Sequence, residues 1–247
     1  MSTVEEVPAT APVTQEPPRK LRVIIGLPGN SFSNNFLVNW TRALHALWES
    51  GRYEVVVSCQ YSSFVTFSRM KTLGLDVLRG KDQKAFNDAP YDVFVTIDSD
   101  IMFSPAQLVE LIEATAVHPV VTGSYMMADL EHFACVKEWD ETFFAQHGTF
   151  QFLTPKDVEA WRAETGATFM PVSYNGMGFW AMRKEALNAL QYPFFFQDLQ
   201  RITTPDGKEV VDMCSEDVAL CKNLQNAGYQ VMLHTGIRVG HEKSLII

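Results

Sequence analysis

Two acidic residues follow an apolar stretch of the sequence and could together hold a divalent cation. Residues 91–97 read YDVFVTI and lead directly into Asp98-Ser99-Asp100. Residues i and i+2 of an extended strand point to the same side, so the pattern places both carboxylates near one point. Two such carboxylates repel each other unless a cation lies between or near them. A solvated turn explains the same residues equally well, because Asp and Ser are common in turns.

A second pair of carboxylates stands where a helix is expected to begin. Ser215-Glu216-Asp217 precedes a helical pattern that runs to Ala227 and stops at Gly228. We expect Ser215 to cap this helix, and carboxylates in its first turn gain about 0.3–1 kcal/mol from the helix dipole. That gain explains the pair without any function. In the functional interpretation, one carboxylate is a general base for an acceptor hydroxyl.

A histidine near the C-terminal end stands in the segment Val239-Gly240-His241-Glu242-Lys243. Neutral imidazole is a good ligand for a borderline ion such as Mn²⁺, and carboxylates suit Mn²⁺ or Mg²⁺. Lys243 could meet a phosphate as a point charge. A surface histidine without function is the alternative interpretation.

Glycines in two loops permit a close approach of the backbone to a ligand. Gly176-Met177-Gly178 lies between two expected strands, although a turn or bulge would use these glycines equally well. Gly26-Leu27-Pro28-Gly29 is not a Walker A loop, because no Gly-Lys-Ser/Thr follows. It also lacks the third glycine of a dinucleotide fingerprint.

The elements that must position these residues alternate between strands and helices over the first half of the chain, which predicts a layered α/β sheet that is parallel at least in part. The Ser104-Pro105 and Thr154-Pro155 pairs mark helix starts. Residues 60–88 show no clear period and are expected to form loops and short helices. Strands are predicted at 21–26, 53–58, 91–97, 120–125, 169–174, 179–183 and 230–233, and further helices at 36–47 and 215–227.

Composition restricts the classes of function. The 247 residues are 47% hydrophobic and carry a net charge of −9, as 20 Lys and Arg stand against 29 Asp and Glu. Such a chain is not mostly disordered, collagen-like or a coiled coil, and its acidity makes nucleic-acid binding unfavourable. The acidic, Pro-rich residues 1–20 predict a solvated tail and no signal peptide, which leaves one domain over 21–247. No apolar stretch is long enough for a transmembrane helix. The four cysteines form no C-x-x-C pair and are expected to be reduced.

Taken in order, the motifs resemble those of GT-A glycosyltransferases close to family 2, in particular the small soluble enzymes of bacteriophages and marine viruses. The resemblance rests on TIDSDIMFS, YNGMGFWAMRKEAL, CSEDVALCKNLQNAGYQV and IRVGHEK. Weaker matches are GLPGNSFSNNF, the Ser68-Arg69 pair and residues 79–83. The resemblance covers residues 21–247 and implies a single-domain α/β GT-A fold, with a mixed, mostly parallel central sheet flanked by helices.

The resemblance implies transfer of a sugar from a UDP- or GDP-sugar donor to an acceptor hydroxyl, by a single inverting displacement that depends on Mn²⁺ or Mg²⁺. Asp100 and His241 would bind the metal. Asp98 would hold the ribose or a metal-bound water and would thereby also belong to the metal site. Asp217 would be the base, with Glu216 as the second candidate. Further residues would bind the donor (Leu27, Pro28, Ser31, Tyr61, Arg69, Arg79, Ser99 and Lys243) or face the acceptor (Asn175, Gly176, Met177, Gly178 and Trp180).

Two alternative functions stay open. A nucleotidyltransferase that makes nucleotide sugars also uses metal-binding carboxylates on an α/β sheet, but it normally needs a Gly-rich loop with Arg and Lys, which is missing here. A non-catalytic sugar-binding or virion protein would not need Asp100, Asp217 and His241 together. The expected partners are the nucleotide-sugar donor and a glycan, lipid or protein acceptor, with no nucleic acid. The expected location is the cytoplasm, or the host cytoplasm for a viral protein.

Overall fold

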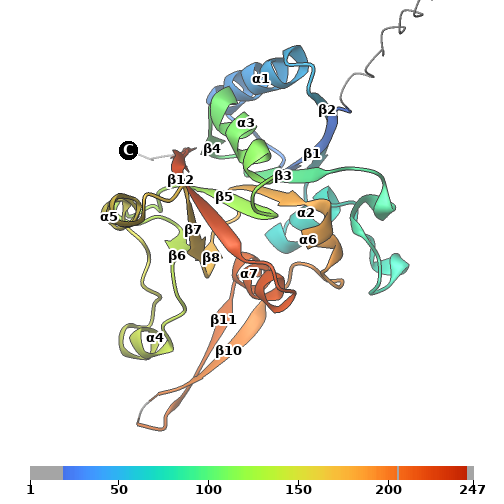
Figure 1. The fold of residues 1–247 in the computed structure, drawn as a ribbon. Helices are drawn as coiled ribbons and strands as arrows, with labels where there is room; N and C mark the ends of the chain where they lie inside the picture. Colours follow the sequence, from blue (N-terminus) through green and yellow to red (C-terminus); the bar gives the residue numbers. More distant parts are fainter. Residues whose placement is uncertain (1–18, 205, 244–247) are drawn as a thin grey trace, which may run out of the picture.

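A mixed seven-stranded sheet forms the centre of the computed structural model, which describes residues 19–204 and 206–243 (Figure 1). Residues 1–18 of the expected tail lie outside the described residues. Five of the strands run in one direction, whereas β9 and β7 run against their neighbours. The order along the sheet is β2 (Tyr53–Gln60), β1 (Leu21–Pro28), β3 (Val93–Ile97), β9 (Phe179–Arg183), β5 (Val120–Ser124), β12 (Val231–Arg238) and β7 (Phe169–Val172).

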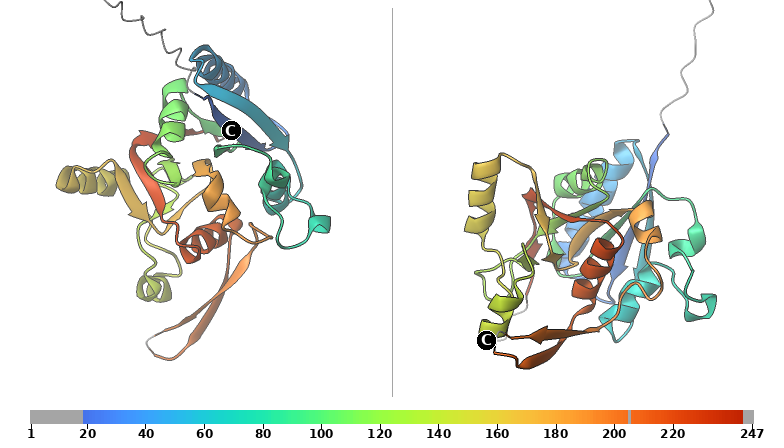
Figure 2. Two further views of the ribbon diagram at one scale, coloured as in Figure 1. Left: turned by 45° about the vertical axis from the view of Figure 1, so that its right-hand side comes forward. Right: turned by 60° about the horizontal axis from the view of Figure 1, so that its bottom comes forward.

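Helices cover both faces of this sheet, as the three views show (Figures 1 and 2). Helices α1 and α3 pack on one face, and α2, α6 and α7 pack on the other. The helices are α1 (Asn34–Glu49), α2 (Val65–Thr72), α3 (Pro105–Ala114), α4 (Glu141–His147), α5 (Pro155–Thr165), α6 (Lys184–Asn188) and α7 (Glu216–Asn226), with 3₁₀ turns η1 (Val77–Arg79) and η2 (Ala85–Asp88).

Two apolar layers hold the sheet and helices together. Successive side chains of a strand point to opposite faces. Val93 and Val95 of β3 therefore pack under α1 and α3, whereas Phe94 packs toward α2 and α6. Strand β9 alternates in the same way, with Trp180 in the second layer. Since both faces are covered, the central strands β3, β9 and β5 are buried and largely apolar.

Local signals in the sequence account for several helix ends. The Ser104 hydroxyl accepts from Gln107 N at the start of α3, and Thr154 does the same for Asp157 at the start of α5, each within a capping box. After α7, Gly228 adopts a φ of +86°, which favours glycine. These boundaries agree with the sequence analysis.

Three two-stranded ribbons lie outside the central sheet. Strands β10 (Asp198–Thr203) and β11 (Glu209–Cys214) form a hairpin that projects from the molecule (Figure 1). The strand predicted at 169–174 is divided at Ser173 into β7 and a second short strand, because the Ser173 backbone N–H donates to the carbonyls of Val136 and Lys137. The other ribbons pair β4 (Ile101–Met102) with β13 (Gly240–His241), and β6 (Cys135–Val136) with β8 (Tyr174–Asn175).

Two further expectations concern cysteines and membranes. Each of the four cysteines is a free thiol. In the described part of the chain, no helix combines the length and the apolar character needed to cross a bilayer.

Candidate active site

The Asp98-Ser99-Asp100 segment is a turn and not the end of an extended strand. Strand β3 ends at Ile97, and Ile101 N donates to the Asp98 carbonyl at 3.1 Å. The prediction that both carboxylates face one point is therefore wrong, because the i, i+2 rule holds only for extended backbone. Asp98 and Asp100 contact different groups, and each belongs to its own cluster.

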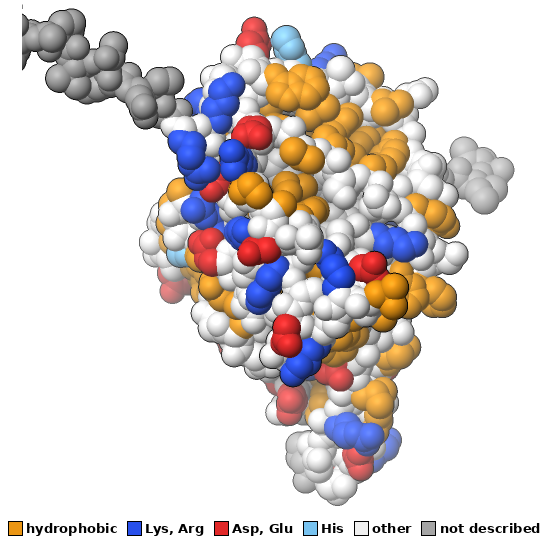
Figure 3. Space-filling model, turned by 90° about the vertical axis from the view of Figure 1, so that its right-hand side faces the viewer, with side chains coloured by type: hydrophobic (Ala, Val, Ile, Leu, Met, Phe, Trp, Pro, Cys, Tyr) orange, Lys and Arg blue, Asp and Glu red, His pale blue; other side chains and the backbone are white. Residues whose placement is uncertain are grey.

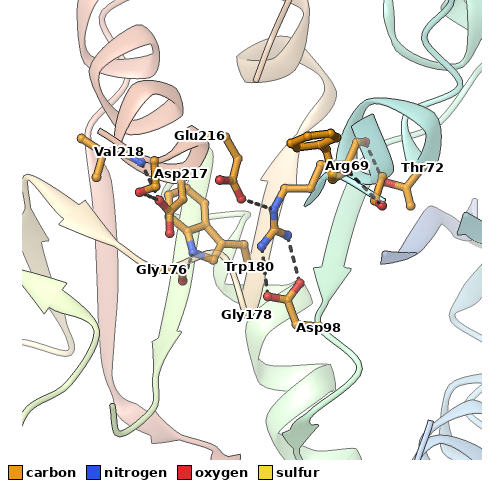
Figure 4. A network of polar contacts seen from close by, with 12 residues as sticks. Arg69, Thr72, Asp98, Gly176, Gly178, Trp180, Glu216, Asp217 and Val218 are labelled. Atoms are coloured by element: carbon orange, nitrogen blue, oxygen red, sulfur yellow. Dashed lines mark hydrogen bonds and ion pairs between the residues drawn. The ribbon is translucent and has the colours of Figure 1, made fainter. Parts of the chain in front are cut away.

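Asp98 belongs to a buried ion-pair network around Arg69 of α2 (Figure 4). The two Nη atoms of Arg69 donate to the two carboxylate oxygens of Asp98 at 2.9 and 3.0 Å, and its Nε donates to Oε1 of Glu216 at 3.1 Å. The side chains of Arg69 and Glu216 are only 6% and 9% exposed. Burial alone would lower the pKa of Arg69, but Asp98 and Glu216 outweigh it and raise that pKa above its ordinary value. The charged guanidinium thus ties α2, the turn after β3 and the start of α7 together.

This network changes the roles expected for three residues. Both oxygens of Asp98 are directed to Arg69, so the structure does not place Asp98 beside Asp100 and His241 as a metal ligand. Glu216 is buried in the same network, which removes it as an available base. The Arg69 guanidinium directs three of its five N–H donors to these carboxylates, and its side chain is only 6% exposed, so it does not reach out toward a nucleotide as expected.

Asp100 forms the second cluster, with His241 and Lys243. The ribbon of β4 and β13 pairs His241 with Ile101 and so brings it beside Asp100. His241 Nε2 lies 3.2 Å from Oδ2 of Asp100, and Lys243 Nζ donates to the same oxygen at 2.7 Å. Burial would raise the pKa of Asp100, but His241 and Lys243 lower it to about 2. The contact with Asp100 in turn raises the pKa of His241.

The other ring nitrogen of His241 fixes how the imidazole is used. Nδ1 lies 2.7 Å from the carbonyl oxygen of Met126, which can only accept a hydrogen bond. Nδ1 therefore carries the proton, and in the neutral ring Nε2 has a free lone pair on the side of Asp100. A backbone carbonyl in this position is a common outer partner of a metal-binding histidine.

The donor set at Asp100 and His241 fits an open site for Mn²⁺ or a similar ion. One carboxylate and one imidazole are suitable ligands for such ions. Within residues 19–204 and 206–243, no group of three or more His, Cys, Asp or Glu side chains could hold a metal ion. Water or a bound ligand would therefore have to supply the remaining coordination.

Asp217 lies in the first turn of α7, next to Glu216 (Figure 4). Its Oδ2 accepts from the Tyr174 hydroxyl at 3.0 Å, and its Oδ1 accepts from Val218 N at 2.9 Å. Ser215 occupies the N-cap, but its hydroxyl donates to Asp217 and caps no backbone N–H, which corrects the expected cap. Burial, followed by the charge of Asp217, raises the pKa of Tyr174 well above its ordinary value. Tyr174 thus remains a donor and holds the carboxylate in a fixed orientation.

Tyr125 lies between the two clusters and was not singled out in the sequence. Its ring centroid is 5.0 Å from that of His241. Burial raises the pKa of Tyr125, and the charges of Asp98 and Asp217 raise it further. Its position at the end of the predicted strand 120–125 is the one signal that could have identified it.

The residues expected to face an acceptor are packed in the core. Trp180 is fully buried, and its indole N–H donates to the Gly176 carbonyl at 2.8 Å, so the ring offers no face to a sugar. Asn175 and Met177 are also buried. A Cβ on Gly178 would lie 2.8 Å from Cε1 of Tyr125, so the glycines let this loop pack against Tyr125. The predicted acceptor contacts of these side chains are therefore wrong.

Most residues expected to bind the donor lie at one end of the sheet, where strands β1, β2 and β3 finish. Gly29 N donates to the Gln60 carbonyl at 3.0 Å, and a Cβ on Gly29 would lie 3.1 Å from that of Ser99. The loop after β1 therefore touches both the end of β2 and the turn after β3. Ser31, Tyr61 and Ser99 belong to these segments, and Pro28 is the last residue of β1. Leu27 is instead buried in the core, so its expected contact with the donor is wrong.

Arg79 does not lie at this end of the sheet. Its guanidinium donates to the Gly74 carbonyl and, at 3.2 Å, to Gln83 Oε1. The side chain thus stabilises its own loop, contrary to the expectation that it binds the donor.

Comparison with known proteins identifies the fold. No family model and no curated protein sequence matches the chain. Among solved structures, GalNAc-T7 with UDP, GalNAc and Mn²⁺ has a TM-score of 0.53 at 10% identity, over 91% of this chain and 43% of that one. The chain thus spans less than half of GalNAc-T7. A197 from STIV has a TM-score of 0.48 at 15% identity, over 91% of this chain and 86% of that one. Glucosyl-3-phosphoglycerate synthase from Mycobacterium tuberculosis, in complex with Mn²⁺, UDP and phosphoglyceric acid, has a TM-score of 0.40 at 12% identity, over 92% and 72%.

Proposed function

We propose that this chain, whose fold is that of the GT-A glycosyltransferases, transfers a sugar from a nucleotide-sugar donor to an acceptor hydroxyl with the help of a divalent cation. The observation that carries the proposal is the 3.2 Å contact between Asp100 and His241, which are 141 residues apart. A carboxylate and an imidazole with a fixed tautomer meet just beyond the carboxyl end of β3 in an α/β sheet. Ligands of open α/β sheets bind outside the carboxyl ends of the strands.

The donor would bind at this end of the sheet through uncharged groups at its base and ribose and positive charge at its diphosphate. We propose that Pro28, Ser31, Tyr61 and Ser99 contact the base and ribose of a UDP- or GDP-sugar. Asp100 and His241 would hold Mn²⁺ or Mg²⁺, which supplies positive charge for the diphosphate leaving group. Lys243, already at 2.7 Å from Asp100, would add its ammonium to the same phosphate oxygens.

Asp217 would act as the base for the acceptor. Its carboxylate takes the proton of the acceptor hydroxyl while the hydroxyl oxygen bonds to the anomeric carbon and the bond to the diphosphate oxygen breaks. This single displacement inverts the anomeric centre. Tyr174 and Val218 hold the carboxylate in position. The burial of Glu216 favours Asp217 over its neighbour for this role.

A release assay tests the proposal against its alternatives. The purified chain is mixed with UDP-, GDP- and dTDP-sugars and Mn²⁺, and nucleoside diphosphate is measured with and without a chelator. Release that the chelator abolishes supports the transferase. Pyrophosphate release from a nucleoside triphosphate and a sugar phosphate would show a nucleotidyltransferase, and the absence of both reactions would indicate a binding protein.

The role of Asp217 can be tested separately from donor binding. Asp217→Asn keeps the shape and removes the base, so we expect transfer to fall by about 10²-fold or more. The rise in Tm caused by donor plus Mn²⁺ should stay as in the wild type. Asp212→Asn, on the exposed strand β11, is the matched control and should transfer normally. Near-normal transfer by Asp217→Asn would contradict the assignment.

A further inference from the structure

Exposed apolar side chains are concentrated in the segment between β2 and η2. Tyr61, Phe64, Phe67, Val77 and Leu78 are each more than half exposed, and Leu78 reaches 89%. Contiguous apolar surface of this kind on a protein usually marks an interaction site. Other exposed apolar side chains, such as Trp48, Val117 and Leu130, lie far from this segment in the sequence.

Helix α2 presents these side chains outward. Phe64, Phe67 and Lys71 follow the i, i+3, i+7 spacing that places residues on one face of a helix, and all three are exposed. The rings of Phe64 and Phe67 meet edge to face at 6.1 Å. The opposite face carries Arg69 and Thr72, which are buried. Thus α2 directs its arginine to the ion-pair network and its aromatic rings to solvent.

An apolar hollow of about 490 Å³ adjoins this helix. Phe64 and Phe67 line it from α2, and Tyr192 and Phe196 line it from the segment after α6. Tyr192 N donates to the Lys81 carbonyl at 3.0 Å, which places Lys81 next to the hollow. The rings, the hollow and the backbone of Lys81 therefore adjoin one another, and we call the exposed residues of this segment the aromatic–basic face (Phe64, Phe67, Lys71, Val77, Leu78 and Lys81).

The charge of this surface is opposite to that of the whole chain. Apart from the buried Arg69, residues 61–84 contain four Lys and Arg but two acids, in a protein of net charge −9. Lys71 and Lys81 are exposed and take part in none of the ion pairs among the described residues, whereas Arg79 and Lys84 donate to backbone carbonyls. Of the two acids, Asp76 accepts from Leu78 N. Figure 3 shows this side of the molecule, where hydrophobic side chains lie beside Lys and Arg.

We propose that the aromatic–basic face docks on a lipid surface that carries anionic headgroups. Phe64, Phe67 and Leu78 would enter the boundary between headgroups and acyl chains, and Lys71 and Lys81 would meet the phosphates. Exposed aromatic and aliphatic side chains flanked by free lysines are the pattern of an interfacial segment. The proposal is independent of sugar transfer, because binding to vesicles needs neither donor nor turnover.

Vesicle flotation with the full chain tests this proposal. We expect the protein to float with vesicles of phosphatidylcholine mixed with phosphatidylserine, more weakly at high salt, and poorly with phosphatidylcholine alone. The double variant Phe64→Ser and Phe67→Ser should bind mixed vesicles at least about tenfold more weakly than the wild type, because two inserting rings are lost. The double variant Lys71→Glu and Lys81→Glu should lose the preference for phosphatidylserine.

Matched controls change the same kinds of residue elsewhere on the surface. Trp48 at the end of α1 and Val117 after α3 are 59% and 65% exposed, so Trp48→Ser with Val117→Ser controls for lost apolar surface. Lys156→Glu on α5 controls for charge. Neither control should change flotation, and circular dichroism checks that every variant is folded. Failure of the wild type to float, an equal loss in the controls, or self-association through this face without flotation would overturn the proposal.

Discussion

Replacing Arg69 by methionine removes the one cation of the buried network and keeps most of its aliphatic length. The wild-type guanidinium makes three charge-assisted hydrogen bonds, at 2.9 and 3.0 Å to Asp98 and 3.1 Å to Glu216. In the variant both carboxylates lose their partner. Asp98 is 27% exposed and can recover water, whereas Glu216 is only 9% exposed and is left as an unpaired charge.

The expected loss follows from that unpaired carboxylate. Breaking a buried ion pair by removing one partner costs about 3–5 kcal/mol of the free energy of unfolding. For a chain of this size, such a loss lowers Tm by roughly 10 °C. Glu216→Gln in the Arg69→Met background removes the stranded charge, so the double variant should recover about 1 kcal/mol or more relative to additivity.

Urea unfolding of five variants, including Glu216→Gln alone to complete the double-mutant cycle, measures these terms. Arg69→Lys keeps a charge but cannot donate to both carboxylates as the planar guanidinium does, so it should fall between wild type and Arg69→Met. Arg162→Met, on the exposed face of α5, is the control and should change stability little. If Arg69→Met stays within about 1 kcal/mol of the wild type, the network does not stabilise the fold as its geometry implies.

Three other substitutions test separate parts of the molecule. Asp100→Ala removes the carboxylate beside His241, so donor plus Mn²⁺ should no longer raise Tm in a thermal-shift assay; a wild-type rise would refute the metal assignment. In Gly176→Ala the new Cβ meets the Tyr125 hydroxyl, and urea unfolding should show a loss of about 1–3 kcal/mol, whereas unchanged stability would mean that Tyr125 yields freely. Burial lowers the pKa of His234 below its ordinary value of 6.5, against the opposing charge of Glu110. The unfolded chain then binds the proton more readily, so stability should fall as pH drops below about 6.5. His234→Phe should flatten this part of the pH profile, and a wild-type profile equal to that of the variant would contradict the argument.

The sequence predicted the central sheet well because its strands are buried on both faces. Continuous apolar runs identified β1, β3 and β9, and Ser-Pro and Thr-Pro pairs located the starts of α3 and α5. The β10–β11 hairpin was missed because most of its residues are exposed, so no apolar run marks it. The dipeptide Asp206-Gly207 between two segments rich in β-branched residues was the available signal.

The candidate site was only partly predictable, because its contacts join segments that are far apart in the sequence. The proximity of Asp100 and His241 followed from motif order, and the β4–β13 ribbon brings them together. The ion-pair network of Asp98 did not follow from the sequence. Its partner Arg69 lies 29 residues before it, and Glu216, which also accepts from Arg69, lies 118 residues after it, in helices that no local pattern joins. Because Asp98-Ser99-Asp100 forms a turn and not the expected strand end, the two aspartates contact different partners.

The place of β9 between β3 and β5 matters for the chain as it leaves the ribosome. Strands β1, β2 and β3 can pair as soon as they are synthesised, but β3 and β5 are joined only through residues 179–183. Until then two apolar strands have open edges, and such edges are prone to pair with other chains. Asp100 gains its imidazole neighbour only after residue 241 has emerged, 141 residues later. The candidate site therefore assembles after the strands around it, and chaperone protection would matter most for nascent chains that stop before the inserted strand.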